Sequence, residues 1–230
     1  MKFNFKLLGV ICLSLFFQPL VAQENGLVER VRQKLNLVND YVAEGVMKTH
    51  VTFIKASLGK VKVYYKKPNQ IKIKKDGGIS LLPRGGVSIT INSLLNTNQY
   101  IAIPAGKQVY KGKNLEVIKL IPTDDKLEWV ISTLWIDPTD ALVYKTFTTT
   151  KENGSFEISM DYGTFANYGL PSKIVFAFNT KDYKLPNGIT LEFGEEDPAS
   201  KLRKAKGNKG TIEITYSNYT INKGISNTVF

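Results

Sequence analysis

The chain has 230 residues, a formal net charge of +11 and one cysteine. A lone cysteine excludes an internal disulfide and a cysteine-rich metal site, and the length suits a single domain with its own core. The positive charge favours anionic membrane surfaces or acidic proteins as partners, although net charge does not determine a fold.

Residues 1–22 have the pattern of a secretory signal peptide. Lys2 and Lys6 precede an apolar run over residues 7–17, and Ala22 is a small residue at the expected cleavage point. We therefore expect an exported protein whose residues 23–230 form a single domain. Cleavage after Ala22 would also remove Cys12, so the mature chain would contain no thiol.

Residues 26–43 are the best helix candidate. Apolar side chains recur at spacings of three and four, while polar side chains occupy the remaining positions, as in an amphipathic helix. Gly45 is a residue that can end such a helix. The apolar stripe, which must be buried on another part of the chain, consists of Val28, Val31, Leu35, Val38 and Val42.

From residue 46 the apolar pattern changes to a period of two, which is typical of β-strands. Segments 46–57, 60–66 and 70–75 are predicted to be strands, and the last two share an apolar face and a lysine face. The apolar side chains include Phe53, Val63, Tyr65, Ile71 and Ile73. We interpret the lysines as a solvent-exposed face, with docking to anionic head groups or to an acidic partner as the alternative.

Residues 77–86 interrupt the strand pattern. Two pairs of glycines flank a short apolar segment, residues 79–82, which contains Leu81 and Leu82. Because glycine permits backbone conformations that other residues avoid, this arrangement predicts a hinged loop or flap with an apolar centre.

Residues 129–147 predict a hairpin around which the rest of the sheet is organised. Asp137 and Pro138 supply the first two positions of a β-turn. The first strand is apolar on both faces, so it either lies between two layers or lines a concave apolar surface. We expect Trp129, Ile131 and Trp135 on one face, Val130, Leu134 and Ile136 on the other, and Tyr144 on the second strand.

The pattern continues to residue 221 and predicts about ten strands with a single helix. One helix among so many antiparallel strands predicts a mainly β fold: an incomplete, strongly curled antiparallel β-barrel with the N-terminal helix packed on its concave side as a lid. A hydrocarbon chain would compete with the helix for this surface, because acyl binding gains about 0.8 kcal/mol per buried methylene.

Four short motifs occur in an order that resembles the outer-membrane lipoprotein carrier and sorting superfamily, the LolA/LolB-like proteins. They are residues 66–73 (KKPNQIKI), 76–77 (DG), 134–138 (LWIDP) and 170–171 (LP), preceded by the signal peptide and the amphipathic helix. The resemblance implies a periplasmic, non-enzymatic carrier: an open barrel with a helical lid whose cavity holds the acyl chains of lipoproteins. Residues 78–86 depart from the aromatic-rich strand expected in that family.

On this reading, an apolar cavity holds acyl chains of lipoproteins or other lipids, and membrane-bound release or acceptor proteins are further partners. We expect the cavity to be lined by Phe53, Val63, Tyr65, Ile71, Ile73, Leu81, Leu82, Trp129, Ile131, Trp135 and Tyr144. We expect the lid to consist of Val28, Val31, Leu35, Val38 and Val42. The period of two does not distinguish a cavity lining from an ordinary core.

The sequence offers no recognisable catalytic or metal-binding set. His50 is the single histidine and has no second histidine, cysteine or HExxH motif to act with it. A hydrolase would require a convergent Ser/His/Asp set around it. We therefore expect a monomer that is not an enzyme and has no cofactor, no metal and no nucleic acid partner. The alternative function is an envelope sensor or interaction domain of the same fold, with no transported ligand.

Overall fold

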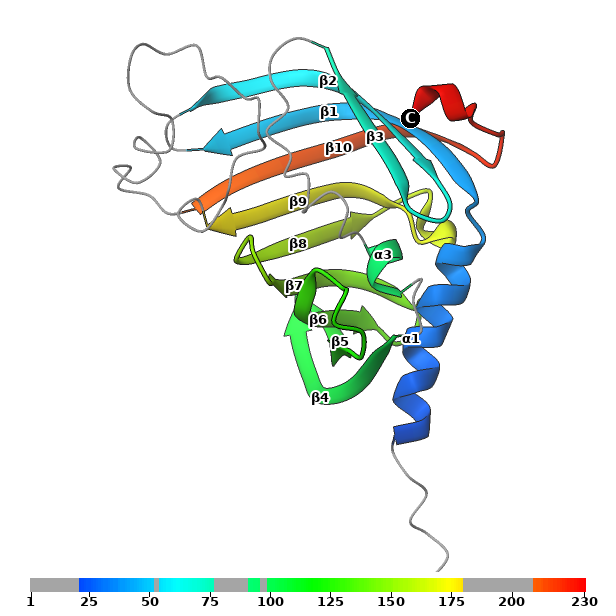
Figure 1. The fold of residues 1–230 in the computed structure, drawn as a ribbon, viewed down its shortest axis with the longest axis vertical. Helices are drawn as coiled ribbons and strands as arrows, with labels where there is room; N and C mark the ends of the chain where they lie inside the picture. Colours follow the sequence, from blue (N-terminus) through cyan, green and yellow to red (C-terminus); the bar gives the residue numbers. More distant parts are fainter. Residues whose placement is uncertain (1–20, 52–53, 77–90, 96–98, 180–208) are drawn as a thin grey trace, which may run out of the picture.

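The computed structural model describes residues 21–51, 54–76, 91–95, 99–179 and 209–230. Ten antiparallel strands in these residues form one sheet in the order β3-β2-β1-β10-β9-β8-β7-β6-β5-β4. The sheet is strongly curled, and its two end strands, β3 and β4, do not pair, so the barrel stays open (Figure 1). The predicted fold class, a mainly β, incomplete barrel with an N-terminal helix, is confirmed.

The strands are β1 (Asp40–Val51), β2 (Ile54–Lys66), β3 (Gln70–Lys75), β4 (Tyr100–Tyr110), β5 (Lys113–Pro122), β6 (Trp129–Asp137), β7 (Leu142–Thr150), β8 (Ser155–Tyr162), β9 (Pro171–Asn179) and β10 (Lys209–Ile221). The helical segments are α1 (Val21–Asn36), α3 (Ile91–Leu95), η1 (Ala166–Tyr168) and η2 (Asn227–Val229). No helix in these described residues is long and apolar enough to cross a membrane.

The strand order joins two meanders through the last strand. Consecutive strands from β4 to β9 are neighbours, as are β1, β2 and β3, and β10 pairs with both β9 and β1. The C-terminal strand therefore brings the two halves of the chain together. This pairing creates the continuous curved surface on which the candidate site is built.

Helix α1 runs across one end of the strands (Figure 1), and Val28, Val31 and Leu35 are buried in the main core. The helix ends at Asn36, so the prediction that it extends to residue 43 was wrong. Asn222, just after β10, explains the ending: its side-chain oxygen accepts from the backbone N–H of Asn39 at 2.7 Å, and its amide donates to the carbonyl of Leu37 at 2.8 Å. These bonds hold the chain in a turn.

Two of the five predicted lid residues consequently lie outside the helix. Val38 lies in the turn after α1 and is buried in the core. Val42 is in β1, paired with Thr220 of β10 and Tyr64 of β2, so it does not belong to a lid. The periodicity continued across the boundary because Val38 and Val42 fit a helical stripe as well as the start of a strand.

Gly45 lies within β1, not at the end of a helix. The pairing of β1 with β10 shifts register at this point, and a Cβ at Gly45 would lie 2.3 Å from the carbonyl oxygen of Thr215. The close approach of the two backbones therefore requires glycine. The single strand predicted over residues 46–57 is also wrong, since β1 ends at Val51 and β2 begins at Ile54.

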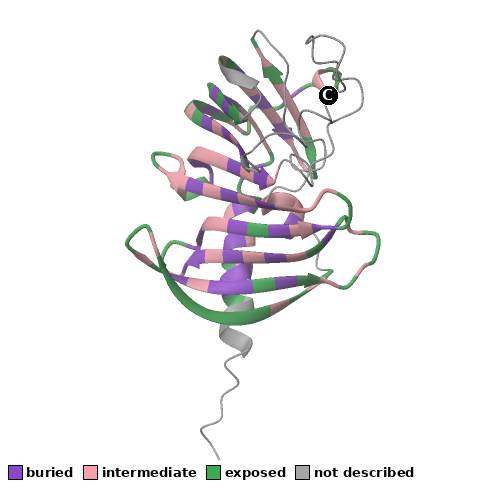
Figure 2. Cartoon of the chain, turned by 90° about the vertical axis from the view of Figure 1, so that its left-hand side faces the viewer, coloured by how far each residue is buried: buried purple, intermediate pink, exposed green. Residues whose placement is uncertain are grey.

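Buried and less buried residues alternate along several strands (Figure 2), as expected when successive side chains point to opposite faces of a sheet. We call the face whose side chains join the main core the inner face, and the opposite one the outer face. Val63 and Tyr65 of β2 are buried on the inner face, and Ile71 and Ile73 of β3 pack against them. The predicted alternation in residues 60–66 and 70–75 is confirmed.

The predicted hairpin at residues 129–147 is confirmed as β6 and β7, but its faces differ from the prediction. A register shift between Trp129 and Ile131 interrupts the alternation, and the exposed Val130 lies within it. Trp129 therefore shares the inner face with Leu134 and Ile136, which are fully buried. One extra residue in a strand reverses the faces of the residues on one side of it.

Candidate functional site

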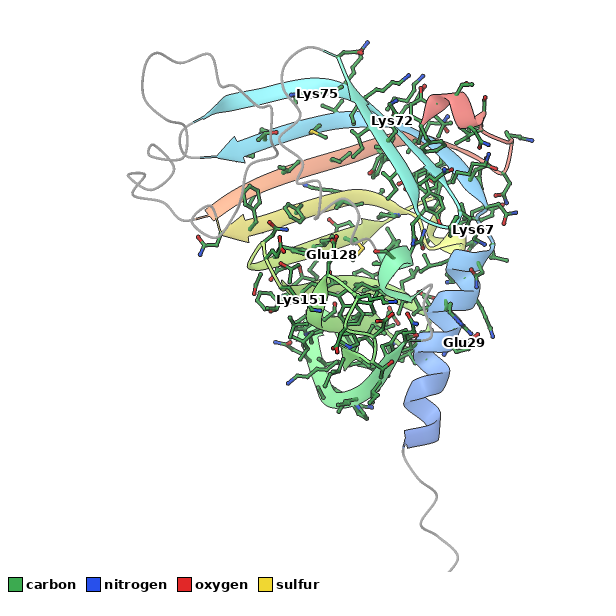
Figure 3. All side chains as sticks on the ribbon, in the orientation of Figure 1. Glu29, Lys67, Lys72, Lys75, Glu128 and Lys151 are labelled. Atoms are coloured by element: carbon green, nitrogen blue, oxygen red, sulfur yellow. The ribbon has the colours of Figure 1, made fainter. Side chains whose placement is uncertain are left out.

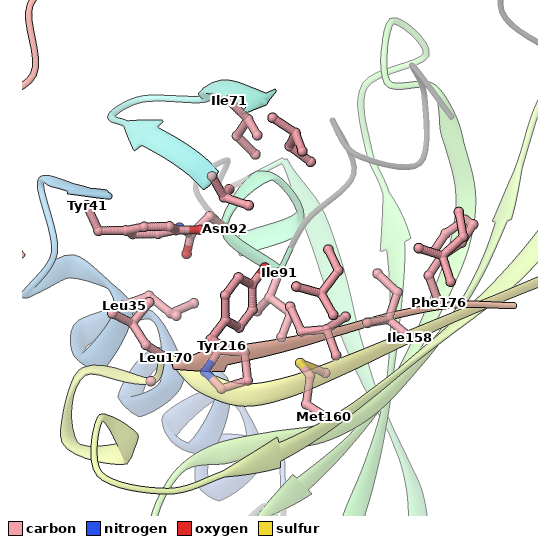
Figure 4. Close-up of a pocket in the computed structure, with 17 residues that line it drawn as sticks. Leu35, Tyr41, Ile71, Ile91, Asn92, Ile158, Met160, Leu170, Phe176 and Tyr216 are labelled. Atoms are coloured by element: carbon pink, nitrogen blue, oxygen red, sulfur yellow. The ribbon is translucent and has the colours of Figure 1, made fainter. Parts of the chain in front are cut away.

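An apolar cavity of about 150 Å³ opens on the inner face of the sheet (Figure 4). Its walls come from both halves of the sheet, from α1 and from α3. The lining residues are Leu35, Tyr41, Val63, Ile71, Ile73, Ile91, Asn92, Ile158, Met160, Gly169, Leu170, Pro171, Ile174, Phe176, Ile212, Ile214 and Tyr216. None of these described residues is charged, so the cavity suits a hydrocarbon group.

Three of the predicted cavity residues, Val63, Ile71 and Ile73, line this cavity, together with Leu35 of the predicted lid. Tyr65 does not line the cavity, but its ring stacks on that of the lining residue Tyr41 at a centroid distance of 5.1 Å. Trp129 is buried in the same core but does not line the cavity. Phe53, Leu81 and Leu82 lie outside the described residues.

The remaining predicted residues, Ile131, Trp135 and Tyr144, do not line the cavity. The ring of Trp135 lies on the outer face, where its indole N–H donates to Gln108 of β4. The Lys145 ammonium lies 4.7 Å from that ring, and Lys113 of β5 lies 5.2 Å from the Tyr144 ring. A cation over an aromatic face is favourable, so these side chains serve contacts outside the cavity.

The turn between β4 and β5 folds over the outer face of the sheet. The hydroxyl of Tyr110 donates to the hydroxyl of Ser159 of β8 at 3.1 Å, and Lys111 pairs with Asp161 at 2.5 Å. This second layer explains why β6 is apolar on both faces: one face joins the core, and Trp135 on the other lies beneath a hairpin. Of the two interpretations open from the sequence, packing on both faces is the one observed around Trp135, whereas Val130 is exposed.

Sequence reasoning missed the cavity residues contributed by three strands. These are Ile158 and Met160 of β8, Ile174 and Phe176 of β9, and Ile212, Ile214 and Tyr216 of β10. Their alternation with polar residues is visible in the sequence and identifies each apolar face. The sequence did not show that β10 pairs with β1. This pairing brings the residues of β8, β9 and β10 into the same cavity as Val63 and Ile71.

Polar bonds hold α1 against the turn between β6 and β7. The guanidinium of Arg30 donates to the carbonyl oxygens of Pro138 and Thr139, each at 2.9 Å, and the Lys34 ammonium donates to the carbonyl of Asp140. Two donors in a fixed planar fork give directional contacts that a single ammonium cannot reproduce. Side chains of α1 are therefore hydrogen-bonded to the turn that follows the LWID residues of the LWIDP motif.

Replacing Arg30 by alanine should loosen this attachment. We expect the free energy of unfolding to fall by about 1–2 kcal/mol, since two hydrogen bonds are lost at a solvent-exposed site. Urea unfolding measures this loss, and Arg30→Lys should give an intermediate value because it keeps the charge without the fork. Equal stability of all three proteins would show that the bonds do not hold the helix.

Asp137 organises the turn itself. Its carboxylate accepts from the Lys113 ammonium at 3.0 Å and from the backbone N–H of Thr139 at 2.9 Å. Burial of the carboxyl raises its pKa, but the bonds from Lys113 and from the backbone of Thr139 and Asp140, with the lysine charge, outweigh burial and lower the pKa overall. The charged form is therefore the one that the fold stabilises.

This shift predicts a pH-dependent contribution to stability. Because the folded-state pKa lies below the unfolded value of about 3.9, the contribution is present above that pH and is lost as the pH falls through the folded-state pKa. Asp137→Asn should cost about 1–2 kcal/mol at pH 7 and less at pH 3. Asp140→Asn in the same turn is the control, and a loss for Asp137→Asn that is the same at both pH values would contradict the prediction.

Several lysines of β2, β3 and the turn between them form ion pairs or hydrogen bonds with other parts of the chain. Lys62 pairs with Glu44 of β1 at 2.7 Å, and Lys66 donates to the carbonyl of Ile225 at 2.9 Å. Lys67 donates to the carbonyl of Asn36 at the end of α1 at 2.8 Å. Lys72 of β3 (Figure 3) is paired with Tyr64 on the outer face, whereas Lys75 is paired with the buried Val61 of the inner face. Lys66 and Lys67 thus connect chain segments, and the outer face of β2 and β3 remains basic.

No protein-family model matches the chain, and no curated protein matches it significantly. Solved structures do. A domain from Vibrio parahaemolyticus named for outer membrane lipoprotein sorting superposes with a TM-score of 0.56 at 11% identity, covering 90% of this chain and 96% of that one. A DUF1329 family protein from Desulfovibrio piger gives a TM-score of 0.55 at 12% identity, covering 91% and 96%.

A LolA superfamily protein from Nitrosomonas europaea gives a TM-score of 0.53 at 11% identity, covering 90% of this chain and 96% of that one. At such low identity the likeness concerns the fold, and it extends over nearly the whole of each chain. The order of motifs in the sequence resembles the same superfamily, and the superpositions show the fold that this resemblance implies. The chain therefore has the fold of the LolA-like, outer-membrane lipoprotein-sorting superfamily.

Proposed function

We propose that this protein is a periplasmic, non-enzymatic carrier that encloses the acyl chains of lipoproteins or other lipids. The observation that supports the proposal is the uncharged cavity between the curled sheet and α1. The likeness to a domain named for outer membrane lipoprotein sorting and to a LolA superfamily protein adds to it. The signal peptide pattern at residues 1–22, which lies almost entirely outside the described residues, supports the periplasmic location.

The size of the cavity indicates how an acyl chain would enter. A cavity of about 150 Å³ accommodates a molecule of the size of benzene, roughly six carbons. At about 0.8 kcal/mol per methylene, six carbons give roughly 5 kcal/mol, which corresponds to a Kd in the submillimolar range. Tighter binding of a longer chain therefore requires contact with more of the inner face, which a movement of α1 would expose.

The small volume also favours a second candidate, an envelope sensor or interaction domain that transports no ligand. In that case the side chains of α1 and the sheet would remain packed on each other throughout the working cycle. The two functions differ in one measurable property, which is whether the purified protein contains or takes up an acyl chain.

Native mass spectrometry and lipid extraction of the mature protein, purified from its own envelope, test this property directly. We expect a bound acyl lipid, and we expect the delipidated protein to take up a fluorescent fatty-acid probe. Absence of both a bound lipid and probe uptake would exclude the carrier and favour the interaction domain.

A further inference from the structure

The cavity has a polar end that the carrier proposal alone does not explain. Figure 4 shows Tyr41, Asn92 and Tyr216 on the side where Leu35 of α1 lies, whereas Ile158 and Phe176 mark the other side. Tyr41 comes from β1, Tyr216 from β10 and Asn92 from α3. The rings of Tyr41 and Tyr216 both contact the ring of Tyr219, at centroid distances of 5.4 and 5.1 Å, so the two tyrosines belong to one cluster.

The tyrosines of this region fall into two groups by their hydrogen bonds. Tyr162 and Tyr219 each donate to a backbone carbonyl, of Val143 and Pro171, at 2.7 Å. The hydroxyls of Tyr41 and Tyr216, the two that line the cavity, have no hydrogen-bond partner among the described residues. The two hydroxyls that no described residue bonds are therefore those that a ligand in the cavity would reach.

Asn92 adds a third group of the same kind. Its side-chain oxygen is buried and has no hydrogen-bond partner within the described part of the chain. A buried polar group without a partner is costly, and native structures keep few of them. With the hydroxyls of Tyr41 and Tyr216, the Asn92 oxygen makes three polar groups without a partner in the described residues around one end of the apolar cavity, where a ligand can supply the partners.

The charges of the site determine which head group fits. The described lining residues carry no cation to neutralise a carboxylate or phosphate, and an unpaired ion is expensive to bury. Burial raises the pKa of both Tyr41 and Tyr216, so both phenols stay neutral and remain hydrogen-bond donors. An ester or amide carbonyl would accept from these phenols, and a hydroxyl or N–H would donate to Asn92.

We propose, on the basis of the carrier function above, that the cavity selects lipids with a neutral head of ester, amide and hydroxyl groups over fatty-acid anions. The acyl chain lies toward Ile158 and Phe176, and the neutral head lies at the α1 end between Tyr41, Tyr216 and Asn92. The polar groups at the α1 end thus select the head group by hydrogen bonding, while the apolar side at Ile158 and Phe176 binds a hydrocarbon chain without further selection.

The test compares two probes with the same acyl chain, 1-monomyristoylglycerol and myristate, by displacement of a fluorescent acyl probe at pH 8. We expect the neutral ester to bind at least tenfold more tightly than the anion. Tyr41→Phe and Tyr216→Phe should each weaken binding of the ester about three- to tenfold, as expected for one lost hydrogen bond, without changing that of myristate. Asn92→Leu should act in the same direction.

Tyr64→Phe, on the outer face of β2, is the matched control and should change neither affinity. Equal affinity of the unmodified protein for the two probes would overturn the selectivity while leaving the carrier proposal intact. The same holds if the phenylalanine variants fold normally by thermal unfolding and bind the ester unchanged, since water would then satisfy the hydroxyls. Binding of neither probe would instead overturn the carrier proposal.

Discussion

The variant Ile174→Trp is expected to lose at least tenfold in affinity for an acyl probe, while Val175→Trp on the same strand retains it. Ile174 lines the cavity, and its partners across β8 and β10 are Met160 and Ile214, which line it too. A larger indole at this position occupies space that a ligand needs. Exclusion of two methylenes alone costs about 1.6 kcal/mol, which is more than tenfold in Kd.

Val175 is the matched control because successive residues of a strand point to opposite faces. Its partners are Ser159 and Glu213, both on the outer face of the sheet. The measurement is titration of a fluorescent fatty acid into each delipidated protein, with thermal unfolding to verify that both variants fold. An acyl chain that binds Ile174→Trp as tightly as the unmodified protein would occupy some other surface, and the cavity would not be the binding site.

The sequence predicted the features that depend on local patterns. The alternation in residues 60–66 and 70–75 correctly identified Val63, Ile71 and Ile73 as inner-face residues, and Asp137-Pro138 correctly placed a turn. The stripe of Val28, Val31 and Leu35 correctly identified the buried side of α1. Each of these predictions rests on the period of one element and on the chemistry of one turn, which the sequence displays directly.

The features that the sequence did not predict depend on contacts between distant segments. Asn222 ends α1 from the far end of the chain, so Val42 became part of β1 without any local signal at residue 36. The register shift near Val130 placed Trp129 and Trp135, which were expected on the same face, on opposite faces of the sheet. In both cases a single irregularity decided the position of a predicted site residue, and periodicity has no means of locating it.

The composition of the cavity also depends on contacts between distant segments, which the sequence did not predict. Its α1 end combines residues from β1, β10 and α3, which lie far apart in sequence and meet because β10 pairs with β1. Each strand could be recognised as amphipathic, yet the sequence did not indicate which strand lies next to which. The polar groups of Tyr41, Asn92 and Tyr216 therefore became a candidate recognition site once the strand order was known.

Val31→Asp tests how firmly α1 is held on the sheet, and we expect the largest loss of stability for it. Val31 is 2% exposed and belongs to the main core together with Leu35 and the inner face of the sheet. A carboxylate there has to be buried without a partner, protonated, or released by undocking the helix. We expect the free energy of unfolding to fall by about 3–5 kcal/mol.

Gln33→Asp places the same charge on the exposed side of α1 and should cost about 0.5 kcal/mol or less. Urea unfolding followed by the fluorescence of the buried Trp129 measures both variants. A helix that only rests loosely on the sheet would make the two losses similar, and the inner face would then be largely uncovered without a ligand. A large difference between them means that α1 is part of the packed core, so an acyl chain that displaces it must replace those contacts with its own methylenes.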